Sequence, residues 1–125
     1  MTAPRRDREL IPVTILSGQA LSAEVNVGGL QIVGILMPAG WDTAGISLQA
    51  LIRETGGATK TPVWGNVQDQ GGVAFLVTAP VLDSYVAIAP TVALLGLGRV
   101  RVRSGTSGTP VNQTADRVLY LACLT

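Results

Sequence analysis

The chain has 125 residues, enough for one domain with a modest core and too few for two. Hydrophobic residues make up 47% of it and charged residues 14%, and the formal net charge is +1. This near balance excludes a protein that binds DNA through bulk charge, an acidic tail protein and a disordered segment. Histidine is absent and Cys123 is the single cysteine, so a histidine-based triad and an internal disulfide are excluded as well.

The first nine residues, MTAPRRDRE, are expected to form an extended arm before a single folded domain that spans residues 10–125. Such arms are usually mobile termini, but they can also strap onto adjacent subunits, which makes Arg5 and Arg6 candidate contacts. The arm has no apolar stretch of signal-peptide length behind it, and no later segment has the pattern of a membrane helix. We therefore expect synthesis in the cytoplasm and no membrane partner.

Fifteen glycines and seven prolines interrupt the chain, so long helices have no room to form. Short runs rich in valine, isoleucine and leucine between turn signals predict about eight to nine short strands. Only Pro90–Leu95 has the pattern of a helical turn. The predicted strands are Leu10–Leu16, Ala20–Val27, Leu30–Met37, Ile46–Glu54, Pro62–Val67, Val73–Thr78, Ser84–Ala89, Leu97–Arg103 and Arg117–Leu124.

Two of these runs alternate between apolar and polar residues, as half-buried antiparallel strands do. In Ala20–Val27 the apolar side comprises Leu21, Ala23, Val25 and Val27, and in Ile46–Glu54 it comprises Ile46, Leu48, Ala50 and Ile52. Many short strands with turns every 8–12 residues are typical of sandwiches and jelly rolls. The predicted fold is therefore all-β, an antiparallel β-sandwich or jelly roll.

Other predicted strands are apolar on both sides. In Leu30–Met37 one side would carry Val33, Ile35 and Met37, and the other Leu30, Ile32 and Leu36; Arg117–Leu124 shows the same pattern. A loop could cover the second side, or a neighbouring subunit could, because obligate interfaces resemble a bisected core. The mean hydropathy of +0.41 favours the subunit, so we expect a homo-oligomer, with a trimer as the guess.

The clearest polar pattern is the row Arg99, Arg101 and Arg103, which a strand would project to one side while Val100 and Val102 face the core. The row is interpreted first as a solvated or edge-protecting face, and second as a contact for an acidic neighbour. Nucleic acid is a weak third interpretation, because aromatic residues make up only 4% of the chain and supply no stacking platform.

Two loops carry further contact candidates. Trp41, between two turn-forming segments, either closes the end of the sandwich or anchors an interface or a sugar ring. Ser104–Asp116 is the longest loop and is expected to be polar and flexible; its candidate contacts are Asn112 and Gln113. Asn112 also begins a glycosylation-like triplet, for which an ordinary polar loop is the preferred interpretation.

No pattern in the chain predicts catalysis. Lys60, the only lysine, lies in a glycine-rich hairpin, and the eight carboxylates are scattered without the spacing of a calcium loop. The stretch Gly96–Arg99 lacks the third glycine of a dinucleotide fingerprint. We therefore predict no enzyme, no catalytic residues, no cofactor and no metal.

Two blocks, VNVGGLQIVGILMPAGWDTAGISLQA (Val25–Ala50) and VRVRSGTSGTPVNQTADRVLYLACLT (Val100–Thr125), resemble a family of small tailed-phage and prophage virion proteins. Members share a "GG…GI.MPA.WD.A.I.LQA" block and a closing "RSGTS..PVNQ.ADR" block. Many carry an aspartate–glycine hairpin where this chain has Thr55-Gly56-Gly57. The resemblance implies a jelly-roll-like structural protein encoded among head or tail morphogenesis genes, without established catalytic residues.

These observations predict a non-enzymatic structural protein of a phage particle, assembled in the host cytoplasm and located in the virion. The first hypothesis is a decoration or minor head protein whose partners are the major capsid protein or other virion proteins, with no nucleic acid bound. Many weak contacts across a symmetric lattice would supply its avidity. The alternative is a carbohydrate-binding adhesin module of a head or tail fibre, with Trp41 stacking on the sugar.

Overall fold

The computed structural model describes residues 8–58, 60–88, 94 and 96–125, which form eight β-strands without an α-helix. Arg5, Arg6 and most of the predicted helical turn at Pro90–Leu95 lie outside these residues. The first strand already begins at Arg8, inside the predicted arm. The strands are β1 (Arg8–Ile15), β2 (Val25–Gly28), β3 (Gln31–Leu36), β4 (Ile46–Thr55), β5 (Thr61–Asn66), β6 (Tyr85–Ala87), β7 (Gly98–Ser104) and β8 (Arg117–Leu124).

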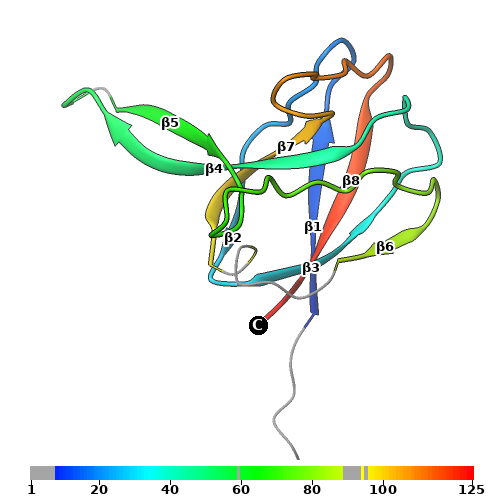
Figure 1. Ribbon diagram of the computed structural model, residues 1–125, viewed down its shortest axis with the longest axis horizontal. Helices are drawn as coiled ribbons and strands as arrows, with labels where there is room; N and C mark the ends of the chain where they lie inside the picture. Colours follow the sequence, from blue (N-terminus) through cyan, green and yellow to red (C-terminus); the bar gives the residue numbers. More distant parts are fainter. Residues whose placement is uncertain (1–7, 59, 89–93, 95) are drawn as a thin grey trace, which may run out of the picture.

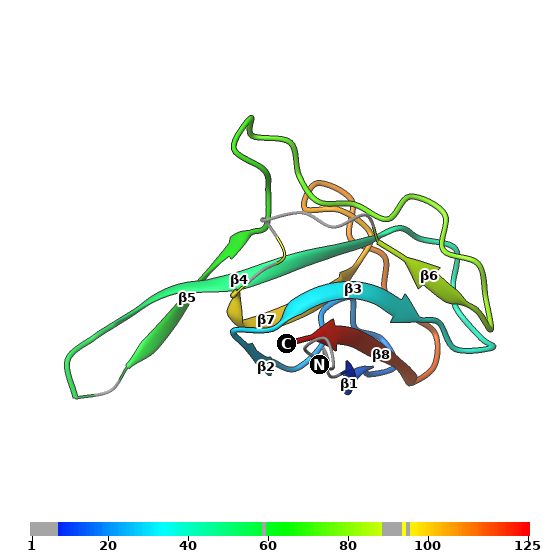
Figure 2. The same ribbon diagram turned by 90° about the horizontal axis from the view of Figure 1, so that it is seen from below.

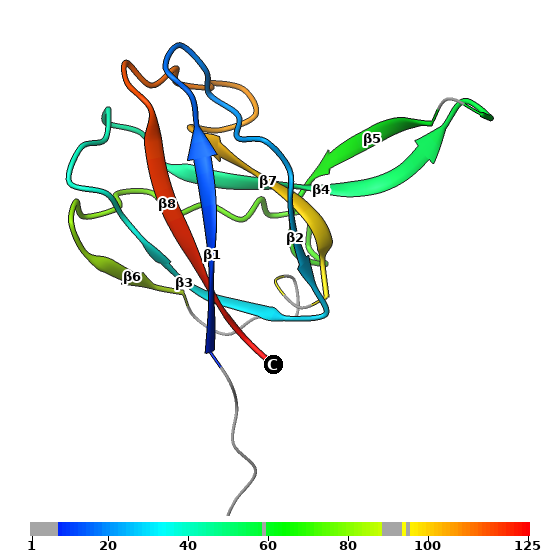
Figure 3. The ribbon, with the colours of Figure 1, turned by 180° about the vertical axis from the view of Figure 1, so that it is seen from behind.

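The strands form two four-stranded antiparallel sheets, which confirms the predicted all-β sandwich (Figures 1 and 3). Sheet A has the strand order β1-β8-β3-β6, and sheet B has the order β2-β7-β4-β5. The chain passes from one sheet to the other at every connection except the β4–β5 hairpin. The outermost strands in sequence, β1 and β8, are paired, and so in turn are β2 with β7, β3 with β6 and β4 with β5.

The core lies between the sheets and is filled by alternate residues of the longer strands. β8 turns Leu119, Leu121 and Cys123 inward, and β7 turns Val100 and Val102 inward, all at most 1% exposed. The opposite residues of both strands point out of the sandwich. The prediction that Val100 and Val102 face the core is therefore confirmed. In each sheet, the residues that alternate with the inward ones form an outer face.

Two predicted strands are shorter than the sequence suggests. Only the last three residues of the run 20–27 belong to the strand β2 (Val25–Gly28), because the Ser22 hydroxyl accepts the Val102 N–H at 2.9 Å, in the place of a backbone carbonyl. The run Val73–Thr78 is not a strand; it forms isolated bridges, such as the one between Val77 and Ile46. In both places the apolar residues typical of a strand are present, but the chain makes too few successive ladder bonds.

A β-bulge in β3 overturns the predicted sides of that strand. The pairing to β8 shifts between Ile32 and Gly34, so one extra residue, Val33, is inserted opposite Cys123 and Ala122. An extra residue reverses the alternation. Ile32, Ile35 and Met37 all face the core and are 0%, 1% and 5% exposed, while Val33 is half-buried. Ile35 and Met37 therefore cannot form the outer apolar side that the sequence predicts for them.

The far half of the β4–β5 hairpin extends away from the rest of the sandwich, as Figures 1 and 2 show. The prediction placed Ile52 on the buried side of β4 with Ile46 and Leu48. Ile46 and Leu48 are buried, but Ile52 is 60% exposed. The reason is that β4 leaves the sandwich before Ile52, and the pairing with β5 shifts between Leu51 and Arg53. The far half of the hairpin has no second sheet opposite it.

Candidate functional site

The outer face of sheet A is apolar, and we call it the apolar face. Its large exposed side chains come from three strands and are 40–47% exposed: Leu10, Tyr85, Val118 and Tyr120. Register places them together, because Tyr120 of β8 lies opposite Pro12 on one side and Leu36 on the other, and Leu36 lies opposite Tyr85. The outer face of a two-layer sandwich is normally polar, so this patch requires an explanation.

Tyr85 lies flat on this face, over the backbone of Gly34. A β-carbon at Gly34 would collide with the Tyr85 ring and hydroxyl, and the hydroxyl donates to the Val33 carbonyl at 3.4 Å. The Arg8 guanidinium lies 5.3 Å from the centre of the same ring. Gly34 thus serves to bring the tyrosine down onto the sheet, which flattens the apolar face.

The outer face of sheet B is polar and contains the predicted row of arginines on β7; we call it the arginine face. The three side chains do project to one side, as predicted, but their surroundings differ. Arg99 is ion-paired with Glu24 and Glu54. The hydrogen bond to Glu54 and the nearby negative charge of Glu24 raise the pKa of Arg99. The charge of Arg99 is therefore already compensated within the chain.

Arg101 and Arg103 have only neutral partners among the described residues. Arg101 Nη2 donates to Gln49 Oε1 at 2.6 Å, and its guanidinium lies 4.3 Å from the centre of the Trp64 ring. Arg103 is only 6% exposed; its Nε donates to Ser47 Oγ at 2.9 Å and its Nη2 to Asn66 Oδ1 at 3.0 Å. Burial lowers the pKa of both arginines.

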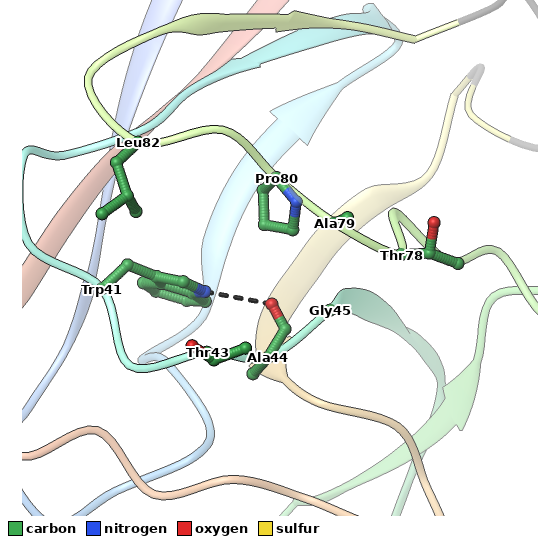
Figure 4. Close-up of a pocket in the computed structure, with 8 residues that line it drawn as sticks. All are labelled: Trp41, Thr43, Ala44, Gly45, Thr78, Ala79, Pro80 and Leu82. Atoms are coloured by element: carbon green, nitrogen blue, oxygen red, sulfur yellow. Dashed lines mark hydrogen bonds between the residues drawn. The ribbon is translucent and has the colours of Figure 1, made fainter.

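Trp41 lies in the wall of a small pocket between the loop 38–45 and the segment 78–82 (Figure 4). The pocket has a volume of about 240 Å³, and Pro80 and Leu82 lie on one side of the indole. Trp41 is 8% exposed and its Nε1 donates to the Ala44 carbonyl at 3.1 Å. The indole thus closes the core at this flank and offers little free ring surface.

The closing loop 104–116 is held by a buried amide rather than left free. Gln113 is fully buried; it accepts from the Asp42 N–H at 2.8 Å and donates to Ser104 Oγ at 2.7 Å. Arg117 pairs with Asp42 at 2.7 Å and holds the pKa of that carboxyl below its usual range. Of the two residues predicted to contact partners here, only Asn112 is exposed, and Gln113 is structural.

The described residues contain little reactive chemistry. Cys123 is buried, and burial raises its pKa to about 11, which leaves the thiol protonated at neutral pH. No group of three histidine, cysteine, aspartate or glutamate side chains is close enough to hold a metal ion within the ranges described. In the same part of the chain, no helix is long and apolar enough to cross a membrane.

The sequence predicts the arginine row but not the residues that surround it. Trp64 lies in a predicted strand, but the sequence does not show that this strand, β5, pairs with β4 next to β7. For this reason Trp64 was not predicted as a neighbour of the arginines. The apolar face was expected, but on the wrong residues of β3. Its actual members on β8, Val118 and Tyr120, belong to the strand predicted to be apolar on both sides.

Comparisons of the chain with protein-family models, with curated proteins and with solved structures find no match. The two outer faces and the sequence resemblance are therefore the observations that bear on function.

Proposed function

We propose that this chain is a non-enzymatic structural protein of a phage particle, a decoration or minor head protein that assembles with copies of itself. The observation that carries the proposal is the apolar face on sheet A. It places exposed aliphatic and tyrosine side chains on β1, β8 and β6, three of the four strands of the sheet, and such a surface is typical of a homo-oligomer interface.

The apolar face is best suited to bind a second copy of this chain. Among the described side chains it presents, Arg8 is the one with a charge, and it already lies against Tyr85. A surface without opposed charges can meet an identical surface without electrostatic penalty, as a symmetric contact requires. A trimer remains our guess for the oligomer, and major capsid protein or other virion proteins remain the proposed partners.

The particle assignment rests on the resemblance of Val25–Ala50 and Val100–Thr125 to small tailed-phage virion proteins. The nested strand pairing supports it: pairing β1 with β8, β2 with β7, β3 with β6 and β4 with β5 is what a long hairpin rolled into two sheets produces, the arrangement of a jelly roll. No chemistry is needed for such a role.

The alternative function, a carbohydrate-binding adhesin module, depends on a free indole at Trp41. That side chain is 8% exposed and its N–H is already bonded to Ala44, so little ring face is open to a sugar. The burial of Trp41 therefore favours the structural proposal over the adhesin.

The proposal is tested by counting copies of this protein in phage particles purified from the source lysate, using quantitative mass spectrometry. A copy number comparable with that of the major capsid protein is the expected result. A few to a few dozen copies would move the protein to a vertex, spike or tail position. Absence from the particles would overturn the assignment to the virion.

A further inference from the structure

The arginine face, on the outer side of sheet B, carries two arginines that lack an acidic hydrogen-bond partner among the described residues. Among the described residues, ion pairs join Arg99 to Glu24 and Glu54, and Arg117 to Asp42. Arg101 and Arg103 have no carboxylate partner in this part of the chain. The two guanidiniums are neighbours on one side of β7, and the positive charge of Arg101 adds to burial in lowering the pKa of Arg103. Partly buried charges of like sign are costly unless an anion compensates them, and the charge of Glu24 opposes only part of the effect of burial on Arg101, whose pKa stays lowered.

The two guanidiniums are nevertheless held in place. Strand pairing places Gln49 opposite Arg101, Ser47 opposite Arg103 and Asn66 opposite Gln49, so each arginine is bonded by a neutral side chain of the next strands. A guanidinium can donate five hydrogen bonds. Within the described residues Arg101 donates one to a side chain and Arg103 donates two, and Arg101 Nε is buried without a partner. The two guanidiniums are therefore held in fixed positions, and each has N–H donors that no described side chain accepts.

A hollow of about 420 Å³ adjoins Arg101. Its other lining residues come from the end of β1 and from the segment before β2, and they are aliphatic, amide or hydroxyl side chains: Thr14, Leu16, Gln19, Leu21, Ser22 and Ala23. Among the described residues of this lining, Arg101 is the only one with a charge. The hollow therefore combines one cation with neutral walls, which suits a carboxylate attached to a short aliphatic stem.

The spacing of the arginines indicates how such carboxylates would be carried. Residues two apart in a strand are about 6.7 Å apart, and this is also the repeat of alternate side chains in an extended peptide. An extended acidic segment with carboxylates at every second residue can place one of them at Arg101, while Arg103, only 6% exposed, contributes nearby positive charge rather than a contact. The carboxylate at Arg101 would accept hydrogen bonds from a planar guanidinium, which is the geometry arginine binds best.

Other polyanions are less suited to this face. Glu24 and Glu54 lie beside Arg99 at one end of the row, and the net charge is only +1, so the extended positive field that a nucleic acid requires is missing. The Trp64 ring already has Arg101 against it, which removes one stacking surface that an acidic sugar would use.

We propose that Arg101, with the hollow beside it and the positive charge of Arg103 nearby, binds an extended acidic segment of another protein, in which aspartate or glutamate occupies alternate positions. The inference goes beyond the proposed function: it concerns the opposite face from the self-association surface and holds whether or not the protein belongs to a phage particle.

The test is a titration of the full chain with an acetylated, amidated peptide in which glutamate alternates with threonine. Binding is followed by calorimetry and by the NMR signals of the Trp64 indole N–H and the Arg101 Nε–H. We expect both signals to shift, and the matched peptide with glutamine in place of glutamate to bind at least about tenfold more weakly, since charge-assisted bonds are lost.

Two variants locate the site. Arg101→Gln should weaken the glutamate peptide by about tenfold or more, while Arg53→Gln, which removes the same charge from the exposed hairpin, should stay within about twofold. Equal binding of the glutamate and glutamine peptides, or an unchanged affinity of Arg101→Gln, would overturn the site. Tighter binding of polygalacturonate or of single-stranded DNA than of the peptide at the same two signals would overturn the choice of a protein segment.

Discussion

The two outer faces of this sandwich use similar backbones for opposite purposes. Both are outer faces of four-stranded antiparallel sheets, and both present alternate residues of a strand next to the sheet's edge, β8 in sheet A and β7 in sheet B. On β8 the outward residues include Val118 and Tyr120, about 40% exposed. On β7 they are three arginines, each held by partners on neighbouring strands.

The difference shows what decides the character of a sheet face. The alternation of residues is the same on β7 and β8, and the inward residues are equally buried. What differs is whether cross-strand neighbours hold the outward side chains in place with hydrogen bonds. Gln49, Ser47 and Asn66 do so for Arg101 and Arg103, whereas Val118 and Tyr120 of β8 lie opposite Thr14, Pro12 and Leu36 and stay open to a second surface.

The largest expected effect comes from removing the buried amide that joins the closing loop to the loop between β3 and β4. Gln113 is fully buried and links Ser104, at the end of β7 in sheet B, to Asp42 in the loop between β3 and β4. Gln113→Ala should lower the free energy of unfolding by about 3 kcal/mol, because it leaves buried polar groups unpaired. Urea denaturation would measure it. Asn112→Ala, at the exposed neighbouring position, is the control and should have little effect.

The next effect separates the arginines of one face by their burial. Arg103→Ala should cost about 2 kcal/mol in unfolding free energy, since it removes hydrogen bonds to Ser47 and Asn66 in a buried setting. Arg101→Ala should cost about 1 kcal/mol or less, mainly the loss of its contact with Trp64. Equal losses in urea denaturation would mean that both arginines are structural and that neither is reserved for a ligand.

A smaller effect tests how the apolar face is made. Gly34→Ala places a methyl group where the Tyr85 ring lies, so the exposed ring must move off the sheet. We expect a loss of about 1 kcal/mol in stability, the range of a small packing change at the surface, together with weaker self-association in sedimentation equilibrium. The double variant Gly34→Ala with Tyr85→Ala should recover the lost stability. Unchanged association in the single variant would show that Tyr85 does not belong to the interface.

The smallest effect concerns the inner side of sheet A, which is buried against sheet B, whereas the outer side is exposed to solvent. Cys123 is fully buried, and its pKa is raised to about 11. At pH 8 the folded protein should therefore react with a thiol reagent no faster than it unfolds, and denaturant should release full reactivity. Rapid labelling of the folded chain would contradict the closed packing of β8 against sheet B.

Much of the fold could be predicted from the sequence, because the spacing of apolar residues between turn signals depends only on local chemistry. The strands β1, β3, β4, β5, β6, β7 and β8 lie where the sequence predicts them. Long-range pairing is what the sequence does not reveal. The bulge at Val33 depends on β8 lying beside β3, and it moved Ile35 and Met37 from the surface to the core. The partners of Arg101 and Arg103 on β4 and β5 likewise appear only once the strands are paired.

The central claim, that the apolar face of sheet A joins copies of this chain, is tested most directly by sedimentation equilibrium of three proteins. The natural chain should have a mass that is a multiple of 12.9 kDa, and Tyr120→Lys, which places a charge at the centre of the face, should be monomeric and folded. Val73→Lys, a matched change at a residue 66% exposed outside the face, should keep the natural mass. A monomeric natural chain, or the same assembled mass for all three proteins, would contradict the account.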